Sequence, residues 1–392
     1  MNEKTIVLTR YKGSILCAFM DEKRPLEFRL FNEGDDSVGS IYVCMIKDII
    51  KSIGASFVTY GDNKTGFLKS TAYKRGSLVP LQLKKKGDED KAPQFTDELS
   101  LTGMYTILRN SDKNFAISQK ITGDNRKEIK ETYESFFGDP EYGITLRTNS
   151  LLASKGEVLK EADSLAGIMD DILNAADKRT CGTVLYKGDT EWEKHCIKAD
   201  AASLEHIITD DIDIYDKVKN GIVGKFCTIN SLVKIELYED KMLPLKKLYS
   251  IESGLEEAVK EKVWLKSGGF LYIEQTKALA SIDVNTGKNI SKTDKETTFF
   301  ETNMEATEEI ARQIRLRNLC GIILIDYINM TQERHLNQVT GHLKKLICQD
   351  PVKTKVHDVT ELGLVELTRQ KELEPLKDQL ERAGENYEVT NG

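Results

Sequence analysis

The sequence predicts a multidomain α/β protein, and three observations support this fold class. The chain has 392 residues, and such a length favours two to four compact units of roughly 100 residues each. Short strand-like segments separated by turn residues fill the first quarter of the chain, whereas a pattern of strand, helix and strand fills much of the last third. Apolar residues make up 40% of the chain and charged residues 30%, which is typical of globular proteins.

The first quarter is predicted to contain mainly strands. Residues 1–35 alternate short apolar runs with charges, and a turn-rich segment at 32–36 closes them. We expect a strand meander there. Between Val38 and Gly103 the strand-like segments are closely spaced, which suggests a small barrel of the OB kind; they lie at 40–45, 55–60 and 66–68.

The middle of the chain is predicted to be mixed. After Tyr105 a separate α/β unit is expected, with a helix at 125–137, a strand at 143–147 and a helix at 158–174. The next segments are predicted to be a helix at 215–224, a strand at 233–237 and a helix at 251–263.

The last third carries the segment that is most informative about function. Two strands are predicted at 270–274 and 278–282, and the second runs directly into Asp283. A capping box at 302–305 is expected to begin a helix that ends near Asn318. An apolar strand of the buried, parallel-sheet kind follows at 321–325 and ends at Asp326.

Two carboxylates are expected to meet in this segment. Strand, helix and strand in this order imply a right-handed crossover between parallel strands, so Asp283 and Asp326 should share one carboxyl edge of the sheet. Mg²⁺ is usually held by one or two carboxylates with phosphates and waters, which makes the pair a candidate metal site. Asn285 lies two residues after Asp283 and offers a neutral donor. An Asp that ends a buried strand is also common as a helix cap or loop residue, and the pattern alone leaves both interpretations open.

The composition restricts the remaining classes of function. A formal charge of −7, from 56 basic and 63 acidic residues, argues mildly against promiscuous nucleic-acid binding but is compatible with a local basic site. The 7 cysteines are scattered singly, so we expect reduced thiols and no zinc. The N-terminal residues do not match a secretory signal, and the apolar runs are too short to span a bilayer, so we expect a cytoplasmic protein with no membrane partner.

Several segments, in order, resemble signatures of the DNase-I-like subdomain of the ribonuclease E/G family. They are Ser267-Gly268-Gly269 and the stretches 281–288, 302–318, 321–330 and 361–369. In that family the Asp and Asn of I-D-x-N and the first Asp of I-D-[FY]-x-x-M form the catalytic, metal-binding site. The resemblance therefore implies that Asp283, Asn285 and Asp326 are catalytic, and that Asp283 and Asp326 hold Mg²⁺, for which Mn²⁺ would substitute.

A weaker resemblance covers the whole chain and implies its domain organisation. An RNase-H-like subdomain, which is structural in this family, would consist of residues 1–37 and 208–277. An S1-type OB barrel at 38–103 and a 5′-sensor region at 104–207 would be inserted into it. A DNase-I-like catalytic subdomain with a C-terminal tail would occupy 278–392.

The resemblance also implies RNA-binding residues. Phe57 and Phe67 fall at the aromatic positions of the barrel, where rings stack on unpaired bases. Arg147 and Thr148 fall where the family binds an RNA 5′-monophosphate, and an arginine fork beside a hydroxyl suits its acceptor oxygens. Without the family, a strand Phe is as readily a core residue, and an Arg after a strand can equally be an ordinary surface residue.

Three features depart from the family's pattern. The C-P-x-C-x-G motif, through which two protomers of many relatives share a zinc ion, does not follow Arg369, so we expect any homo-oligomer to form without zinc. Asn329 stands where the family has a second Asp, which removes a charge near the metal site. Asn149-Ser150 replace small residues after Arg147-Thr148, which would alter the phosphate pocket.

The leading hypothesis is an endoribonuclease that uses Mg²⁺ to hydrolyse single-stranded RNA, such as mRNA or rRNA precursors, and leaves 5′-phosphate products. An alternative of a different class is an RNA-binding regulator with the same fold and little or no turnover, which Asn329 and the missing zinc motif suggest. The presence of Asp283, Asn285 and Asp326 favours the enzyme, because a pure binder would not need them. A third interpretation, a structural scaffold whose strand-ending acids are caps, could be distinguished by calorimetric metal titration.

Overall fold

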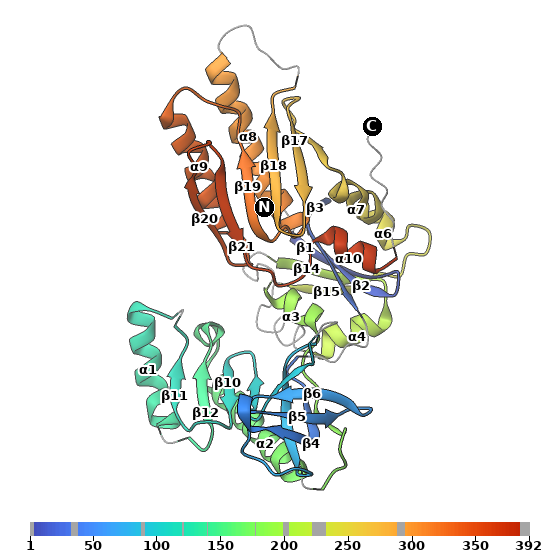
Figure 1. Cartoon of the computed structure of the whole chain (residues 1–392), viewed down its shortest axis with the longest axis vertical. Coiled ribbons are helices and arrows are strands. Elements are labelled where there is room, and N and C mark those ends of the chain that lie inside the picture. Colours follow the sequence, from blue (N-terminus) through green and yellow to red (C-terminus); the bar gives the residue numbers. More distant parts are fainter. Residues whose placement is uncertain are drawn as a thin grey trace. The chain divides into compact units, whose positions relative to one another are not determined.

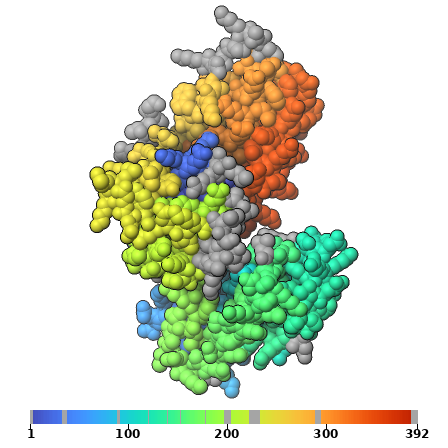
Figure 2. Space-filling view, turned by 180° about the vertical axis from the view of Figure 1, so that it is seen from behind, coloured from blue at the N-terminus to red at the C-terminus, as the bar shows by residue number. Residues whose placement is uncertain are grey.

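The computed structural model describes residues 4–32, 38–87, 91–119, 121–138, 140–176, 178–198, 204–221, 233–287 and 295–384. The chain divides into two units, drawn in Figure 1 and, from behind, in Figure 2. The first unit comprises Met1–Glu33, His195–Lys217 and Leu232–Gly392, and the second comprises Gly34–Lys194 and Val218–Ser231. Within the described ranges, no helix combines the length and the apolar character that crossing a membrane requires.

A five-stranded sheet brings the start of the chain together with segments far along it. β1, β2 and β3 form the antiparallel meander that the sequence predicts. β14 pairs with β1 in parallel, and β15 pairs with β14 in parallel. The elements around this sheet are β1 (Lys4–Tyr11), β2 (Ser14–Asp21), β3 (Arg24–Asn32), α3 (Glu191–Lys198), β14 (Leu204–Thr209), α4 (Ile212–Asn220), β15 (Lys234–Leu237), α6 (Leu245–Leu248), α7 (Ile251–Val259) and α10 (Leu376–Arg382).

Two helix predictions near this sheet change in the structure. The predicted helix at 251–263 is too long, because α7 ends at Val259 and Lys262–Trp264 form a strand, β16. Val263 pairs with Leu271 across the neighbouring strand, and this sheet pairing outweighs the local helical pattern. The predicted helix at 215–224 corresponds to α4, which begins earlier, and residues 222–224 lie outside the described part of the chain.

A six-stranded sheet forms the rest of the first unit, in the order β16-β17-β18-β19-β21-β20. Only β18 and β19 pair in parallel, as predicted, and the other pairs are antiparallel. Residues of α8 and α9 share one buried core with alternate residues of the strands, so the helices cover one face of the sheet (Figure 1). The further elements are β17 (Phe270–Gln275), β18 (Leu279–Asn285), α8 (Lys295–Leu316), β19 (Gly321–Asp326), α9 (Glu333–Ile347), β20 (Thr354–Val359) and β21 (Val365–Arg369).

Two predictions for this sheet are wrong. β19 is not buried on both sides: Ile323 and Ile325 face the helices, whereas Ile322 is 49% exposed, because the helices leave the other face of the sheet open. The segment 302–305 is not a helix cap, because α8 begins earlier, at Lys295. Inside that helix the Thr302 hydroxyl donates to the carbonyl oxygen of Thr298 at 2.8 Å.

The second unit contains the predicted barrel. β4, β5, β6, β8 and β7 pair in sequence, and pairing of β4 with β7 closes the ring, so the expectation of a small OB-like barrel is confirmed. β13 pairs with β4 beside the ring. The elements are β4 (Ile41–Ile50), η1 (Lys51–Ile53), β5 (Ala55–Tyr60), β6 (Lys64–Leu68), β7 (Leu78–Lys85), β8 (Gln94–Thr96) and β13 (Val184–Tyr186).

A mixed region follows the barrel, as predicted. Its four strands form a sheet in the order β11-β12-β10-β9. The buried apolar stripe of its longest helix, which includes Val158, Leu165 and Met169, has the periodicity of an amphipathic helix. The elements are β9 (Ser100–Thr102), β10 (Thr106–Arg109), β11 (Phe115–Ile117), α1 (Gly123–Phe137), β12 (Gly143–Leu146), η2 (Thr148–Leu152) and α2 (Lys155–Ala176).

A buried ion cluster holds α8 on β3 within the first unit. The carboxylate of Glu27, a residue that is 1% exposed, lies 2.6 Å from Nε of Arg315 and 2.6 Å from Nε2 of His195. The guanidinium of Arg29 lies 3.4 Å away. Burial alone would raise the pKa of Glu27, but the charges of Arg29, His195 and Arg315 hold that pKa well below its ordinary value.

Replacement of Glu27 by Gln should destabilise the first unit, because buried Arg29 and half-buried Arg315 would lose the negative charge beside them. Loss of one member of a buried ion pair costs about 3–5 kcal/mol. The pKa of Glu27 is lowered in the folded state. The stabilisation that its charge gives to the folded state is therefore complete above the ordinary pKa of 4.5, and it is lost as the pH falls from 4.5 through the lowered pKa.

Urea unfolding at pH 7 and at decreasing pH measures this effect. The difference in unfolding free energy between wild type and Glu27→Gln should become smaller in acid. Glu256→Gln, which changes an exposed carboxylate of α7, is the control and should shift the unfolding free energy by less than about 0.5 kcal/mol. Equal midpoints for wild type and Glu27→Gln would contradict a stabilising role for the cluster.

Candidate active site

Two aspartates lie side by side on the open face of the six-stranded sheet. β18 and β19 pair in parallel, and their register places Asp283 opposite Asp326. Both side chains are exposed, whereas their neighbours Ile282 and Ile325 face the helices. Neighbouring strands lie about 4.8 Å apart, so the two carboxylates are adjacent, as the crossover pattern predicts. β18 continues to Asn285, so Asp283 lies within the strand and not in a loop after it.

Asn285 points to the same face as Asp283, because side chains alternate along a strand. Its Nδ2 donates a hydrogen bond to Oδ2 of Asp283 at 2.7 Å. The amide therefore restricts the rotation of this carboxylate and leaves the other oxygen of Asp283 available. On the next strand, Tyr272 lies opposite Asp283 and Phe270 lies opposite Asn285.

The charge of this pair has no cation beside it in the described part of the chain. Among the described residues, neither Asp283 nor Asp326 forms an ion pair, and the side chain of Asp326 accepts no hydrogen bond. Like charges that face each other on neighbouring strands destabilise a sheet. Asp283 and Asp326 therefore lower the stability of the sheet unless a cation binds both of them, and such a loss of stability is common at functional sites.

The donor set of this pair fits Mg²⁺. Carboxylate oxygens are hard ligands, and Mg²⁺ commonly takes one or two of them and completes its shell with water and phosphate oxygens. Among the described residues, no group of three or more His, Cys, Asp or Glu side chains is arranged to hold a metal ion. The pair Asp283 and Asp326 is thus suited to an ion that also binds an oxygen-rich substrate.

Helix α8 supports both sides of this site through residues whose role the sequence did not predict. The amide of Asn303, a buried residue, donates to the carbonyl oxygen of Ile328 at 2.8 Å, and its Oδ1 accepts from the N–H of Ile328 at 3.1 Å. These two hydrogen bonds fix the position of the backbone just after Asp326. Glu305 accepts hydrogen bonds from the N–H groups of Lys266 and Ser267 at 2.6 Å and 3.2 Å, which fixes the turn before β17.

The glycines around the site are required by close backbone packing. Gly287 has φ +61, and a Cβ built there would lie 2.3 Å from the carbonyl oxygen of Gly268. A Cβ at Gly269 would lie 2.8 Å from the carbonyl oxygen of Asn285. The turn before β17 and the turn after β18 therefore touch through their backbones.

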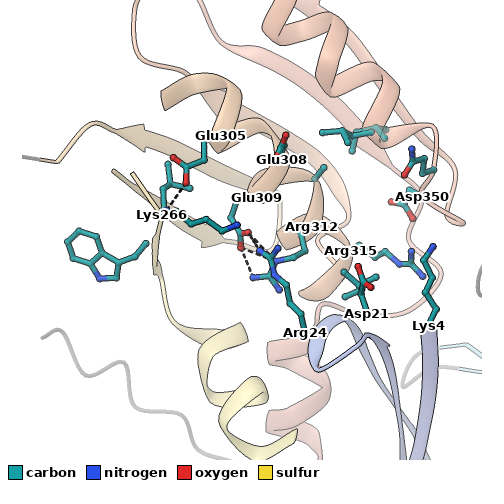
Figure 3. A pocket seen from close by; sticks show the side chains of 17 residues that line it. Lys4, Asp21, Arg24, Lys266, Glu305, Glu308, Glu309, Arg312, Arg315 and Asp350 are labelled. Atoms are coloured by element: carbon teal, nitrogen blue, oxygen red, sulfur yellow. Dashed lines mark hydrogen bonds and ion pairs between the residues drawn. The ribbon is translucent and has the colours of Figure 1, made fainter. Parts of the chain in front are cut away.

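A cavity of about 400 Å³ elsewhere in the first unit does not include the aspartate pair (Figure 3). Its charged walls are paired: Arg24 lies 2.6 Å from Glu309, and the guanidinium of Arg312 binds the same carboxylate. Arg312 also donates to the carbonyl oxygen of Pro25 at 2.8 Å. We interpret this part of the cavity as the seam between β3 and α8, because Arg24, Glu309 and Arg312 satisfy one another across it.

In the second unit, the two predicted RNA-binding phenylalanines, Phe57 and Phe67, lie close together. They lie opposite each other on β5 and β6, and their ring centroids are 6.1 Å apart at an interplanar angle of 74°. Both are half-buried and neither belongs to the buried core of the barrel. The two rings therefore lie outside the buried core of the barrel.

Arg147 and Thr148 lie at the end of β12, where η2 begins. Thr148 is exposed and Arg147 is half-buried. The guanidinium of Arg147 donates to the carbonyl oxygens of Gly103 and Met104 through Nη1. Burial lowers the pKa of Arg147, and the charge of Glu161 opposes that shift. The two backbone carbonyl oxygens thus orient this arginine through Nη1 alone, and the N–H groups on Nε and Nη2 take no part in this contact.

Comparison with known proteins relates most of the chain to ribonucleases. Residues 100–372 match the model of the Ribonuclease E/G family. Ribonuclease G of Escherichia coli (strain K12) is 28% identical over 365 residues, which cover 87% of this chain and 74% of the relative. Ribonuclease E of Haemophilus influenzae (strain Rd) is 28% identical over 392 residues, which cover 94% of this chain and 42% of the relative. The chain thus spans less than half of that ribonuclease E.

Replacement of Gly287 by Ala should disrupt the contact between the two turns, because the new methyl group would meet the Gly268 carbonyl oxygen and the residue would keep a left-handed φ. Strain of this kind costs on the order of 1–3 kcal/mol. Gly341→Ala in α9, where a Cβ meets nothing within 4 Å, should stabilise the helix or leave it unchanged. Thermal unfolding of both variants measures the difference, and an unperturbed Gly287→Ala would disprove the close packing.

Proposed function

Because the chain belongs to the ribonuclease E/G family, whose model matches residues 100–372, we propose that it is an endoribonuclease. Its substrate is single-stranded RNA, such as mRNA or rRNA precursors in the cytoplasm. Cleavage is hydrolytic, depends on Mg²⁺ and leaves a 5′-phosphate on the product. The observation that supports the catalytic assignment best is the adjacent, exposed pair Asp283 and Asp326, which carries two negative charges and has no cation beside it among the described residues.

In this proposal Asp283 and Asp326 would hold one Mg²⁺, which would neutralise charge on the scissile phosphate and lower the pKa of an attacking water. Asn285 holds Asp283 in one orientation through the 2.7 Å hydrogen bond, and its amide faces the same side as the phosphate. Asn303 and Glu305 do not contact the aspartates: Asn303 fixes the backbone just after Asp326, and Glu305 fixes the turn before β17.

The open face of the sheet suits a polymeric substrate. A long RNA strand enters neither a closed pocket nor a narrow cavity without threading its end, whereas an exposed face admits any internal phosphodiester. Phe57 and Phe67 would bind unpaired bases by stacking, which is worth about 1–3 kcal/mol per base. This contribution requires bases that are free of a duplex, so it selects single-stranded RNA.

Arg147 and Thr148 would bind the 5′-monophosphate of the substrate. Arginine has five N–H donors, so Arg147 can keep its contacts to Gly103 and Met104 and still donate to phosphate oxygens. The hydroxyl of Thr148 is exposed beside it. An enzyme with this site acts faster on RNA that has already been cut, because each cleavage leaves a new 5′-phosphate.

Replacement of either Asp283 or Asp326 by Asn should lower the cleavage rate by roughly a hundredfold or more, which corresponds to about 2.7 kcal/mol in the barrier. Each change removes one of the two charges that hold Mg²⁺ and relieves repulsion between the carboxylates, so folding should survive. Glu274→Gln, which changes another acid on the same open face of β17, should cleave at nearly the wild-type rate. Single-turnover cleavage of an A/U-rich oligoribonucleotide measures these rates, and near wild-type cleavage by a folded Asp283→Asn would refute the assignment.

Wild type should cleave 5′-monophosphorylated RNA faster than 5′-hydroxyl RNA, and Arg147→Ala should abolish this preference. Loss of one charge-assisted hydrogen bond costs about 1.5–3 kcal/mol, or roughly tenfold or more in rate. Arg126→Ala is a matched control, because Arg126 also donates to backbone carbonyl oxygens in the second unit, and it should keep the preference. If wild type cleaves both substrates equally, the 5′-phosphate assignment is wrong.

A further inference from the structure

Three aromatic side chains lie together on the open face of the six-stranded sheet. Trp264 is 64% exposed and Tyr272 is 42% exposed, and Phe270 lies between them. The ring centroids of Trp264 and Phe270 are 5.4 Å apart, as are those of Phe270 and Tyr272. Large exposed rings are uncommon unless they contact a partner. We call Trp264, Phe270 and Tyr272 the aromatic platform.

Strand register connects the platform directly to the aspartate pair. Tyr272 lies opposite Asp283, Phe270 lies opposite Asn285, and Trp264 lies opposite Phe270 on the edge strand β16. Residues opposite each other on antiparallel strands have Cβ atoms about 4.5–5.5 Å apart. The platform therefore begins one strand away from Asp283, on the same face.

A lysine supplies positive charge at the platform. Nζ of Lys262 lies 4.2 Å from the ring centroids of both Trp264 and Phe270 and 5.8 Å from that of Tyr272. Lys262 is opposite Tyr272 in the sheet, and Tyr272 is opposite Asp283, so Lys262 lies two strands away from the aspartate pair. Cation–π contacts at exposed sites are weak, so the ammonium group can readily move from the rings to a phosphate.

We propose that the aromatic platform stacks against one unpaired base next to the scissile phosphate and that Lys262 binds a phosphate of the same RNA strand. This proposal rests on the proposed ribonuclease activity, and it assigns a base-binding subsite to the catalytic face. Exposed rings with a cation suit a nucleotide, which has a flat π-face and a negative charge. A protein bound over the platform would also cover Asp283 and block the substrate.

Intrinsic fluorescence tests the stacking directly, because the chain has only 2 tryptophans. Trp192 is 3% exposed, so quenching by RNA should come from Trp264. The full chain carrying Asp326→Asn, which should bind RNA without cleaving it, is titrated with an A/U-rich single-stranded oligoribonucleotide. We expect quenching that saturates with binding and disappears when Trp264→Phe is added. Quenching that persists in Trp264→Phe overturns the proposal.

A scan with abasic nucleotides locates the base. One abasic nucleotide is placed in turn at each position around the cleavage site, and kcat/KM is measured for the wild type. Removal of the stacked base should lower kcat/KM by about 5- to 150-fold, the equivalent of roughly 1–3 kcal/mol of stacking. Trp264→Ala and Tyr272→Ala should lose a similar factor on intact RNA and show little further loss with the abasic substrate.

The conservative variants and a matched control complete the test. Trp264→Phe and Tyr272→Phe keep a ring and should retain most of the wild-type kcat/KM. Phe136→Ala removes an exposed ring in the second unit that also has a lysine over it, with Nζ of Lys155 at 4.0 Å, and it should leave the abasic profile unchanged. Circular dichroism checks that each variant folds. If Trp264→Ala does not fold, the kcat/KM of Tyr272→Ala tests the base-binding role of the platform instead.

The outcomes separate the subsite from the activity. If wild type cleaves RNA but its abasic profile is flat, or if both alanine variants keep the wild-type kcat/KM, the platform is not a base-binding site and the ribonuclease activity stands. If wild type with Mg²⁺ cleaves no RNA, the proposed function fails, and the proposal that rests on it is overturned with it. Quenching in the Asp326→Asn chain then reports RNA binding alone.

Discussion

Parallel pairing of β18 with β19 in one register is the constraint on which the candidate active site depends. The pairs run from Leu279 with Ile322 to Asp283 with Asp326. Since side chains alternate along a strand, a slip by one residue would turn one aspartate toward the helices. The buried side chains of Ile282 and Ile325 prevent that slip, because exposing them to water would cost hydrophobic stabilisation. The core therefore selects the register, and the register brings the two carboxylates together.

Helix α8 links the stability of the first unit to its chemistry. One part of the helix carries Arg315, which pairs with buried Glu27 on β3. Another part carries Asn303 and Glu305, which hold the backbone segments next to Asp326 and before β17. The same helix thus anchors the sheet from its covered face and leaves the other face accessible to a long substrate.

The sequence predicts the adjacency of Asp283 and Asp326 better than it predicts the bounds of the elements around them. Asp283 and Asp326 follow from the order strand, helix, strand, because that order restricts topology. Predictions from local sequence patterns are wrong where tertiary contacts determine the structure. The T-x-x-E pattern at Thr302 predicts the start of a helix but lies inside α8, where Glu305 accepts a hydrogen bond from the backbone N–H of Ser267. β16 was missed because three residues beside a helix carry too little pattern. The aromatic platform was missed with it, since it requires the pairing of Trp264 with Phe270 and not their spacing in sequence.

The central claim is that Asp283 and Asp326 hold one divalent ion together. Electron paramagnetic resonance of Mn²⁺, used in place of Mg²⁺, counts bound ions without any need for cleavage. We expect one Mn²⁺ per chain in the wild type, displaced by excess Mg²⁺, and loss of that ion in both Asp283→Asn and Asp326→Asn, because each variant removes half of the charge that binds it. If either folded variant still binds the same Mn²⁺ with wild-type affinity, the aspartate pair is not the metal site.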